Sequence, residues 1–394
     1  MNAASDPSQP YRGLRVLDVS QGYAGPYCAA LLAQFGADVI KIEPPEGDWV
    51  RRLGKQRGAW SALALAANRG KRSVTVDLKR SGAATMLIRL AGACDVFIES
   101  FRPGVATKLG IDYAAVARAN PRVVYLSVSA YGQTGPQAEH PGTDTVLQAY
   151  SGLMSLNLDA AGLPRRVGFL AVDTATALYA AQAVAAAVYG VRVGGAGQHL
   201  DVSLMQATAA FLAPKLIEAQ WEMGAPQALN VPAGSYQTAD GWIAISLSKE
   251  DHFTAICRAI DAPELITDPR FADFSLRAQH AGELVPQIER RLLGASTSHW
   301  MRRFVAAGIL ASRIHTPAEW LDDEQVRVTG AAPRIDHPLL GTIAVPRVPG
   351  AGAPPQQLPE PGAAAAEVLR DFGFAPDEVT TLVEQGIVCL PTIT

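Results

Sequence analysis

The chain has 394 residues, of which 48% are hydrophobic, and its 34 Lys and Arg against 37 Asp and Glu give a net charge of −3. A typical domain has roughly 150 residues, so this length predicts two structural units or one unusually large one. The composition is that of an ordinary globular protein and excludes disorder, collagen-like repeats and a coiled coil. The balanced charge predicts no binding to nucleic acid or to an anionic membrane.

In chain order, the polar residues 1–12 come first and predict a flexible tail. The next 118 or so residues alternate between apolar runs and helical patterns, which is typical of an open, doubly wound α/β sheet. We expect strands at 14–19, 38–43, 73–78, 94–99 and 123–129, and helices at 26–35, 83–91 and 113–118.

The later part of the chain is richer in helical patterns. We expect helices at 144–156, 174–191 and 203–221, a short strand at 200–202, a linker at 223–234, a strand at 242–247, helices at 250–259 and 282–293, and an extended path at 345–362. Residues 174–191 carry no charge, but their Ala content and two Thr favour a buried helix over a membrane span. The predicted domains are a large one from 13–224 with 326–394 and a small α/β one from 225–325.

Cysteine usage indicates a reducing compartment. Cys28, Cys94, Cys257 and Cys389 are far apart and form no CxxC pair, so neither a disulfide framework nor a zinc site is expected. We therefore expect a cytoplasmic protein. The seven His are dispersed, and there is no HExxH or GxSxG motif, so the sequence shows no metal site and no serine nucleophile.

A basic stretch follows the second predicted strand. Its nine cations stand against one acid, Asp77, and are Arg51, Arg52, Lys55, Arg57, Arg69, Lys71, Arg72, Lys79 and Arg80. If these side chains converge, they form a site for a ligand with several phosphates, such as coenzyme A or a nucleotide. A solvated basic loop is an equal alternative.

Asp173 directly precedes the predicted helix at 174–191. The plain expectation for an acidic residue at this place is an N-cap, whose carboxylate accepts the free amide hydrogens of the first turn. A helix N-terminus also stabilises an ionised carboxylate and keeps it available as a nucleophile. Asp144 stands at another helix start, where a cap is again the default.

Several long motifs, in a fixed order, resemble those of one family. They are GLRVLDVSQGYAGPYCAALLAQFGADVIKIEPP from Gly13, NRGKRSVTVDLK from Asn68, DVFIESFRPG from Asp95, LSVSAYGQTGP from Leu126, GTDTVLQAYSGLM from Gly142 and GQHLDVSLMQA from Gly197. With these motifs the chain resembles the class III CoA-transferases, the CaiB/BaiF family. The resemblance runs from about Gly13 to the C-terminus and is densest before residue 210.

The resemblance implies a Rossmann-like large domain, a smaller middle domain and a homodimer of two interlocked rings. It implies an enzyme that moves coenzyme A from an acyl-CoA thioester to a small carboxylic acid, with CoA as substrate and no metal. Asp173 falls where the family's catalytic aspartate lies and would form mixed anhydrides and an aspartyl-CoA thioester. Because a carboxylate is ionised at neutral pH, this nucleophile needs no general base.

The resemblance also implies contacts with CoA. They map onto Tyr23, Ala24, Lys71, Arg72, Val76, Asp77, Leu78, Lys79, Ser100, Phe101, Arg102, Lys108, Gly142 and Thr143. The chain departs from many relatives at Pro44, where they carry Arg; Arg51 or Arg52 is a candidate substitute for that charge. The glycine-rich flap of the formyl-CoA enzyme has no evident counterpart, so oxalate specificity is not implied.

Two alternatives stay open. Related α-methylacyl-CoA racemases use a His directly before the aspartate of a Gly-His-Asp motif, but here the motif reads Gly142-Thr143-Asp144 and no other His is adjacent to it. A Thr hydroxyl is not a base near neutral pH, which weakens the racemase reading. A non-catalytic CoA-binding protein is the other alternative. Asp144, Arg165 and Arg166 are candidates for the substrate pocket.

Overall fold

The computed structural model describes residues 8–58, 60–159, 161–221, 230–337, 340–353 and 359–390. The chain divides into two compact units. The larger is formed by both ends of the chain, Met1–Ile217 with Gly330–Thr394, and the smaller is Glu218–Thr329. Each unit is described by itself below.

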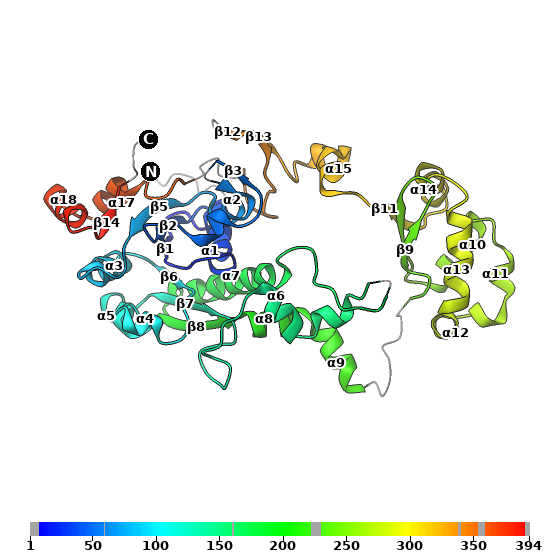
Figure 1. The fold of residues 1–394 in the computed structure, drawn as a ribbon, viewed down its shortest axis with the longest axis horizontal. Coiled ribbons are helices and arrows are strands. Elements are labelled where there is room, and N and C mark those ends of the chain that lie inside the picture. The colour runs from blue at the N-terminus through cyan, green and yellow to red at the C-terminus, as the bar shows by residue number, and fades with distance from the viewer. Residues whose placement is uncertain are drawn as a thin grey trace. The chain divides into compact units, whose positions relative to one another are not determined.

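The larger unit is built on a seven-stranded sheet in the order β14-β5-β2-β1-β6-β7-β8 (Figure 1). Its strands are β1 (Arg15–Asp18), β2 (Asp38–Glu43), β5 (Arg72–Val76), β6 (Val96–Glu99), β7 (Val124–Ser129), β8 (Gln198–Ser203) and β14 (Val388–Cys389). All neighbours pair parallel except β14, which runs antiparallel to β5. This confirms the predicted α/β class with a parallel sheet, and the order of the six parallel strands is that of dinucleotide-binding folds.

Two hydrophobic cores cover the two faces of this sheet, because alternate strand residues point to opposite sides. On one face pack α1 (Ala24–Gln34), α6 (Asp144–Tyr150), α7 (Ala171–Arg192) and α8 (Leu204–Phe211). On the other face pack α3 (Ala83–Ala91), α5 (Tyr113–Ala119) and α17 (Ala365–Asp371). Both faces are therefore buried, as the continuous apolar strands require.

The remaining elements of the larger unit are short. They are η1 (Trp49–Arg52), β3 (Gln56–Arg57), β4 (Trp60–Ser61), α2 (Ala62–Asn68), α4 (Val105–Lys108), η2 (Leu153–Leu156), β12 (Arg334–His337), β13 (Gly341–Ala344) and α18 (Pro376–Glu384). Along the chain, α9 (Ala213–Trp221) begins in the larger unit and ends in the smaller one. The pairs β3–β4 and β12–β13 are antiparallel hairpins outside the main sheet.

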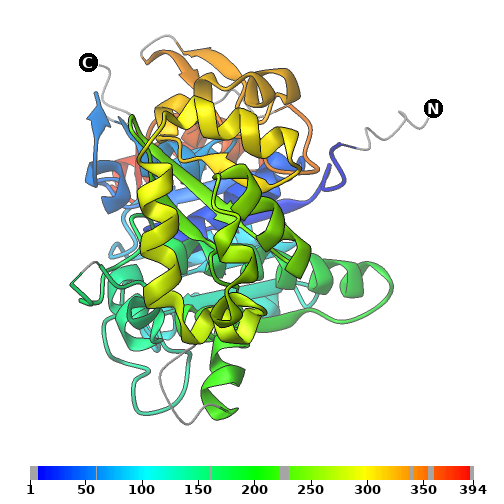
Figure 2. The same ribbon diagram turned by 90° about the vertical axis from the view of Figure 1, so that its right-hand side faces the viewer.

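The smaller unit has an antiparallel sheet in the order β11-β10-β9, formed by β9 (Gly234–Gln237), β10 (Trp242–Ser246) and β11 (Leu310–Arg313). Its helices are α10 (Glu250–Ala259), α11 (Glu264–Thr267), η3 (Pro269–Phe271), α12 (Phe274–Gln279), α13 (Ala281–Leu292), α14 (Thr297–Ala306), α15 (Pro317–Asp322) and α16 (Glu324–Thr329). Helices α13 and α14 pack against this sheet and share its core (Figure 2).

Two long predicted helices are each divided in two. The pattern at 144–156 becomes α6 and η2, because Gly152 between them adopts a left-handed φ of +84°. The pattern at 203–221 becomes α8 and α9, and Pro214 stands at the second residue of α9, where it lacks the amide needed to continue α8. Of the predicted linker, 223–229 lies outside the described residues, and the described part of 345–362 contains no helix or strand.

The helix α7 has 22 residues and is long and apolar enough to cross a membrane. Half of its most apolar stretch of 18 residues is buried, and the helix packs along α1 and α8 (Figure 1). Of the predicted tail, 1–7 lies outside the described residues. Tyr11 packs edge-on against Phe35, with ring centroids 6.1 Å apart, and its amide donates to the Phe35 carbonyl at 3.0 Å. The end of that tail is thus held against the C-terminus of α1.

Candidate active site

A cavity of about 440 Å³ opens at the carboxyl edge of the main sheet. The chain leaves β1 toward one side and β6 toward the other, so the loops after these two neighbouring strands separate and leave a crevice. The cavity is lined by Gln21, Gly22, Tyr23, Ala24, Gly25, Trp49, Ser100, Phe101, Arg102, Pro103, Val128, Ser129, Ala130, Ala138, His140, Pro141, Gly142, Thr143, Val146, Asp173 and Leu204. All of these residues belong to the larger unit.

The loop from β1 to α1 forms one wall, and glycine is required there. Gly22 has a φ of +86°, and a Cβ at this position would lie 2.7 Å from a ring carbon of Trp49. Its amide donates to both carboxylate oxygens of Asp48, at 3.1 and 3.2 Å. The Gln21 amide donates to the Ser100 hydroxyl at 2.9 Å, which joins this loop to the loop after β6.

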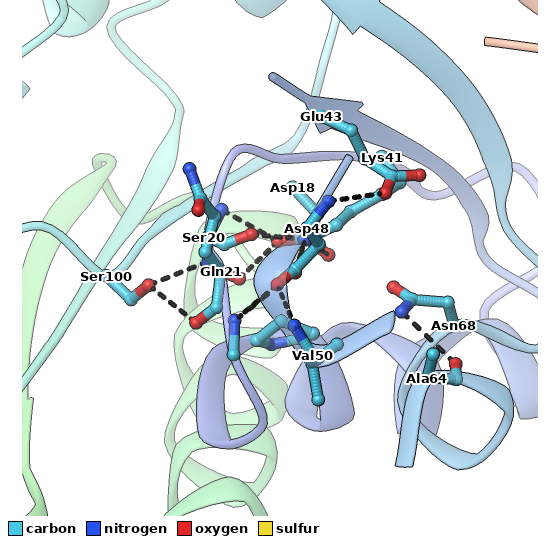
Figure 3. Close-up of polar contacts among 12 residues, drawn as sticks. Asp18, Ser20, Gln21, Lys41, Glu43, Asp48, Val50, Ala64, Asn68 and Ser100 are labelled. Carbon is cyan, nitrogen blue, oxygen red and sulfur yellow. Dashed lines mark hydrogen bonds and ion pairs between the residues drawn. The ribbon is translucent and has the colours of Figure 1, made fainter. Parts of the chain in front are cut away.

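A buried ion cluster lies directly beneath this wall, as Figure 3 shows in part. We use this name for Asp18, Lys41, Glu43, Asp48, Arg51 and Lys71, which carry three negative and three positive charges and are each 6% exposed or less. The Lys71 ammonium lies 2.7 Å from the Asp18 carboxylate, and the Lys41 ammonium lies 3.2 Å from Asp48. The cluster therefore holds Asp48, which in turn holds Gly22.

The two lysines respond differently to this environment. Burial lowers the pKa of Lys71 to about 8, although Asp18 opposes that effect. Lys41 is also desolvated, but the combined attraction of Asp18, Asp48 and Glu43 raises its pKa. The attraction of the carboxylates thus has a larger effect than desolvation on the pKa of Lys41, whereas desolvation has the larger effect on the pKa of Lys71. For Glu43, burial is opposed by Arg51, and the net result is a pKa of about 2.

Asp173 is the third residue of α7, and its carboxylate faces the cavity. Within the described part of the chain, no hydrogen bond or ion pair reaches this carboxylate. Burial, helped by the nearby charge of Asp144, raises its pKa to about 7. The expectation that Asp173 caps the helix is wrong, because α7 begins earlier, at Ala171, and its capping carboxylate comes from another helix.

That cap is Asp144, the first residue of α6. Its Oδ2 accepts the amide hydrogens of Val172 at 2.8 Å and of Asp173 at 3.1 Å. Asp144 is 3% exposed and does not line the cavity, so it lies behind Asp173 instead of beside a substrate. Gly142 precedes it, and a Cβ there would lie 2.5 Å from Ala130, so the turn into α6 also needs glycine.

The structure brings together eight of the residues that were predicted to bind CoA or react. Tyr23, Ala24, Ser100, Phe101, Arg102, Gly142, Thr143 and Asp173 all line the cavity. Residues 76–79 follow β5, two strands from β1 at the same carboxyl edge, and Lys108 ends α4. Neither group lines the cavity itself.

The basic stretch does not converge on one site. Lys71 is fully buried in the ion cluster, and Arg51 binds Glu43 at 2.7 Å. Arg72 points to the opposite edge, where it pairs with Asp38 and Asp371, both at 2.6 Å. The structure thus brings neither Lys71 nor Arg72 to the cavity. The guanidinium of Arg51 is bound by Glu43. Arg51 therefore does not replace the positive charge that many relatives carry at the position of Pro44.

The two substrate candidates Arg165 and Arg166 lie on exposed backbone before α7. Arg165 pairs with Asp159 at 2.7 Å, and neither arginine lines the cavity. By contrast, sequence reasoning missed His140 and Trp49, which do line it. His140 is two residues before Gly142, so its closeness along the chain to the Gly-Thr-Asp motif was the available signal.

The arrangement suits attack on an electrophilic carbon. An unpaired carboxylate in a partly desolvated pocket is a stronger nucleophile than one surrounded by water, because no donor has to be removed from it. Arg102 and His140 are the lining residues that carry or can acquire positive charge, and they offer partners for an anionic substrate group. No group of metal-binding side chains is found among the residues that the structure describes.

Comparison with known proteins agrees with this chemistry. The sequence model of CoA-transferase family III matches residues 11–363. The succinyl-CoA:glutarate CoA-transferase of Mus musculus is 32% identical over 351 residues, which cover 86% of this chain and 80% of that protein. The acetyl-CoA:oxalate CoA-transferase of Acetobacter aceti is 35% identical over 311 residues, which cover 77% and 80%.

A solved structure gives the same result at the level of the fold. The crystal structure of a CaiB/BaiF family protein from Brucella suis has a TM-score of 0.81 and 29% identity, and the match covers 92% of this chain and 99% of that one. The resemblance seen in the motifs is therefore confirmed over nearly the whole chain. The chain belongs to CoA-transferase family III, and it is a transferase.

Proposed function

We propose that this enzyme moves CoA from an acyl-CoA to a small carboxylic acid by covalent catalysis at Asp173. The observation that carries this proposal is the Asp173 carboxylate, which faces the cavity and accepts no hydrogen bond from the described residues. A buried carboxylate without a hydrogen-bond partner lowers the free energy of unfolding, and a catalytic role explains why it stands at this place. Its pKa of about 7 leaves a large ionised fraction at neutral pH.

Four displacements account for the transfer. A carboxylate oxygen of Asp173 attacks the thioester carbonyl, the C–S bond breaks, and a mixed anhydride and CoA thiolate result. The thiolate attacks the Asp173 carbonyl, which gives an aspartyl-CoA thioester and releases the donor acid. The acceptor carboxylate then displaces CoA to form a second anhydride. Finally the thiolate attacks the acceptor carbonyl, which yields the new acyl-CoA and regenerates the Asp173 carboxylate. No step takes up or releases a proton.

We propose that CoA enters along the carboxyl edge of the sheet. Ser100, Phe101 and Arg102 would contact it beside the cavity, and exposed Lys79 and Lys108 are free to meet its phosphates. Lys71 would act on CoA only indirectly, by holding the wall that contains Gly22. Arg72, paired with three carboxylates, would stabilise the far edge of the sheet.

For the acceptor we propose an acid with two carboxylates. The two curated relatives described above are named for glutarate and oxalate, which are both dicarboxylic acids. One carboxylate would attack the Asp173 carbonyl carbon of the aspartyl-CoA thioester and displace CoA thiolate, and the second would pair with Arg102 or His140 at the wall of the cavity.

We also propose an interlocked homodimer in a reducing, cytoplasmic compartment. Large apolar side chains on α7, α8 and α9 are exposed in the single chain, including Tyr189 at 70% and Trp221 at 77%. A second chain is the simplest cover for such a surface. All four cysteines are free thiols, and three of them are buried.

The experiment is intact-protein mass spectrometry after incubation with succinyl-CoA, acetyl-CoA or another donor and no acceptor. A covalent CoA adduct that hydroxylamine converts to a hydroxamate at Asp173 is expected. Asp173→Ala should lose the adduct and transfer while keeping CoA binding; the matched control is exposed Asp377→Ala, which should retain both. Turnover by Asp173→Ala would contradict the mechanism.

The same samples separate the alternatives. Exchange of the α-proton of an acyl-CoA in deuterated water, without any adduct, would favour racemase-like chemistry, for which His140 is available in the cavity wall. CoA binding with neither adduct nor exchange would favour a non-catalytic role.

A further inference from the structure

The start of α7 has more amide donors than its own sequence can satisfy. The residue before it, Leu170, has no side-chain acceptor, and the first-turn amides of a helix have no partner within the helix. At such a place an acidic residue of the first turn normally turns back and accepts these hydrogens. Asp173 is the acidic residue of this turn, but its carboxylate does not do so.

Asp144 takes the amides instead. Its Oδ2 accepts from Val172 and Asp173, at 2.8 and 3.1 Å, although the residue lies 29 positions from Asp173 in the chain. Its Oδ1 accepts from the Gln148 side chain at 2.6 Å. Both carboxylate oxygens of Asp144 are therefore engaged, and its orientation is fixed.

Gln148 extends this arrangement to the segment that leads into α7. Its Oε1 accepts the amide of Val167 at 2.9 Å, and its Nε2 also donates to the Phe169 carbonyl at 3.3 Å. Gln148 is fully buried. One turn of α6 thus holds both the approach to α7 and its first two free amides.

We propose that Asp144, supported by Gln148, is a positioning residue that caps α7 in place of Asp173 and so keeps the Asp173 carboxylate free to react. This inference rests on the proposed covalent function of Asp173. Two hydrogen bonds from amides would stabilise the ionised carboxylate and weaken it as a nucleophile. Because Asp144 accepts these amides, they do not bind the Asp173 carboxylate. The negative charge of Asp144 also disfavours the ionised form of Asp173, so that carboxylate is more reactive when it is ionised.

Several other polar groups line the same cavity as Asp173 and are common to every variant below. Tyr23 stands at the start of α1, Arg102 follows β6, and His140 lies in the loop before α6. The burial of Tyr23 raises its pKa, so it stays neutral over the working range. A change in the titration of Asp173 that appears only when Asp144 is replaced is therefore attributable to Asp144.

The test compares Asp144→Ala, which removes cap and charge, with Asp144→Asn, which keeps an acceptor oxygen. Labelling by a water-soluble carbodiimide with glycine ethyl ester, followed by peptide mapping, gives the pH at which Asp173 is half protonated. That midpoint should fall by roughly one pH unit in Asp144→Asn, which removes only the like charge, and further in Asp144→Ala, which also frees the two amides to bind Asp173. The kcat for transfer should fall about 100-fold in Asp144→Ala and much less in Asp144→Asn.

The control is Asp273→Ala, which removes the cap of α12 in the smaller unit, where the carboxylate accepts the Leu276 amide at 2.8 Å. It should leave the Asp173 midpoint and kcat unchanged. Equal midpoints in Asp144→Ala and in Asp144→Asn, which preserves the cap and is expected to fold, would overturn the inference, because the freed amides would then have no effect on Asp173. So would equal kcat in folded Asp144→Ala and the wild type. Failure of the proposed function is distinguished separately, because labelling of Asp173 does not depend on turnover.

Discussion

At the scale of single residues, Asp173 combines a reactive group with a cost to stability. Its carboxyl has a pKa of about 7 in the folded protein, because burial and Asp144 both disfavour the charge. In the unfolded chain an aspartate titrates near ~3.9. Because the pKa is raised in the folded state, the contribution of Asp173 to the free energy of unfolding is fully present below about pH 4. This contribution is lost as the pH rises toward 7. Ionisation of Asp173 therefore lowers the stability of the folded enzyme in the pH range where the carboxylate is reactive.

Asp173→Asn should remove this cost, because an amide of the same shape carries no charge. We expect the variant to be more stable than the wild type by about 2–4 kcal/mol at pH 8, with the difference shrinking as the pH falls to 5. Chemical denaturation at both pH values measures it. Exposed Asp377→Asn is the control and should change little at either pH. Equal stability of Asp173→Asn and wild type at pH 8 would mean that the folded-state pKa is not raised.

The same ionisation gives a pH dependence of rate. The nucleophile is the carboxylate, so transfer should rise with pH through about 7 and fall in acid as Asp173 takes up a proton. This acid limb is the one that the Asp144 variants are expected to move.

At the scale of elements, the buried ion cluster joins three parallel strands below the cavity. Asp18 ends β1, Lys41 and Glu43 lie in β2, and Lys71 directly precedes β5. The Lys71 ammonium also donates to the Pro26 carbonyl at 2.7 Å and to Asn68 at 3.1 Å, so it binds α1 and α2 as well. Removing one member of such a cluster leaves the buried charge of its partner less well compensated.

Lys71→Met should therefore cost about 3–5 kcal/mol of stability, because it leaves the Asp18 carboxylate without its nearest cation. Urea denaturation of the whole enzyme measures this loss. Lys79→Met makes the same change at an exposed lysine of the same basic stretch and should leave the midpoint nearly unchanged. A Lys71→Met enzyme that keeps its stability but loses affinity for CoA would instead return Lys71 to the role of a direct phosphate contact.

At the scale of the whole molecule, the two units have separate cores and separate polar anchors. In the smaller unit the anchor is Arg277, which is 1% exposed. Its guanidinium binds Glu250 at 2.5 Å and donates to the Val231 and Phe271 carbonyls, each at 3.0 Å. The rings of Phe253 and Phe274 lie 4.5 and 4.6 Å from its centre. It ties the chain entering this unit to its helices.

Arg277→Met should loosen the smaller unit and leave the core of the larger one intact, since the partners of Arg277, including Val231, all belong to the smaller unit. Hydrogen exchange followed by mass spectrometry should show faster exchange confined to residues 230–329. Arg270→Met, which removes an exposed pair with Asp268, is the control and should leave the pattern unchanged. Equal acceleration in both units would mean that they unfold together.

Much of the fold could be predicted because the governing signals are local. The strand at 38–43 and the helices at 83–91 and 250–259 have the predicted bounds, since apolar periodicity and turn residues fix such elements. The hairpin β3–β4 and the strand β14 were not predicted, because two-residue strands carry no periodicity and exist only through their partners. The same reasoning found Asp173 but assigned it the cap, because the competing carboxylate comes from a different helix.

The α/β class, the family and the position of the aspartate in the chain could be predicted from the amino-acid sequence, since they follow from local patterns and ordered motifs. Which charged side chains are available to a ligand depends on the tertiary structure. Lys71 and Arg51 look like their exposed neighbours in sequence, yet they are buried against carboxylates from other strands. It also decided that Asp144 caps α7 and that Asp173 stays free. Hydrogen bonds and ion pairs between segments far apart in the chain depend on how the elements pack, and no local pattern encodes that.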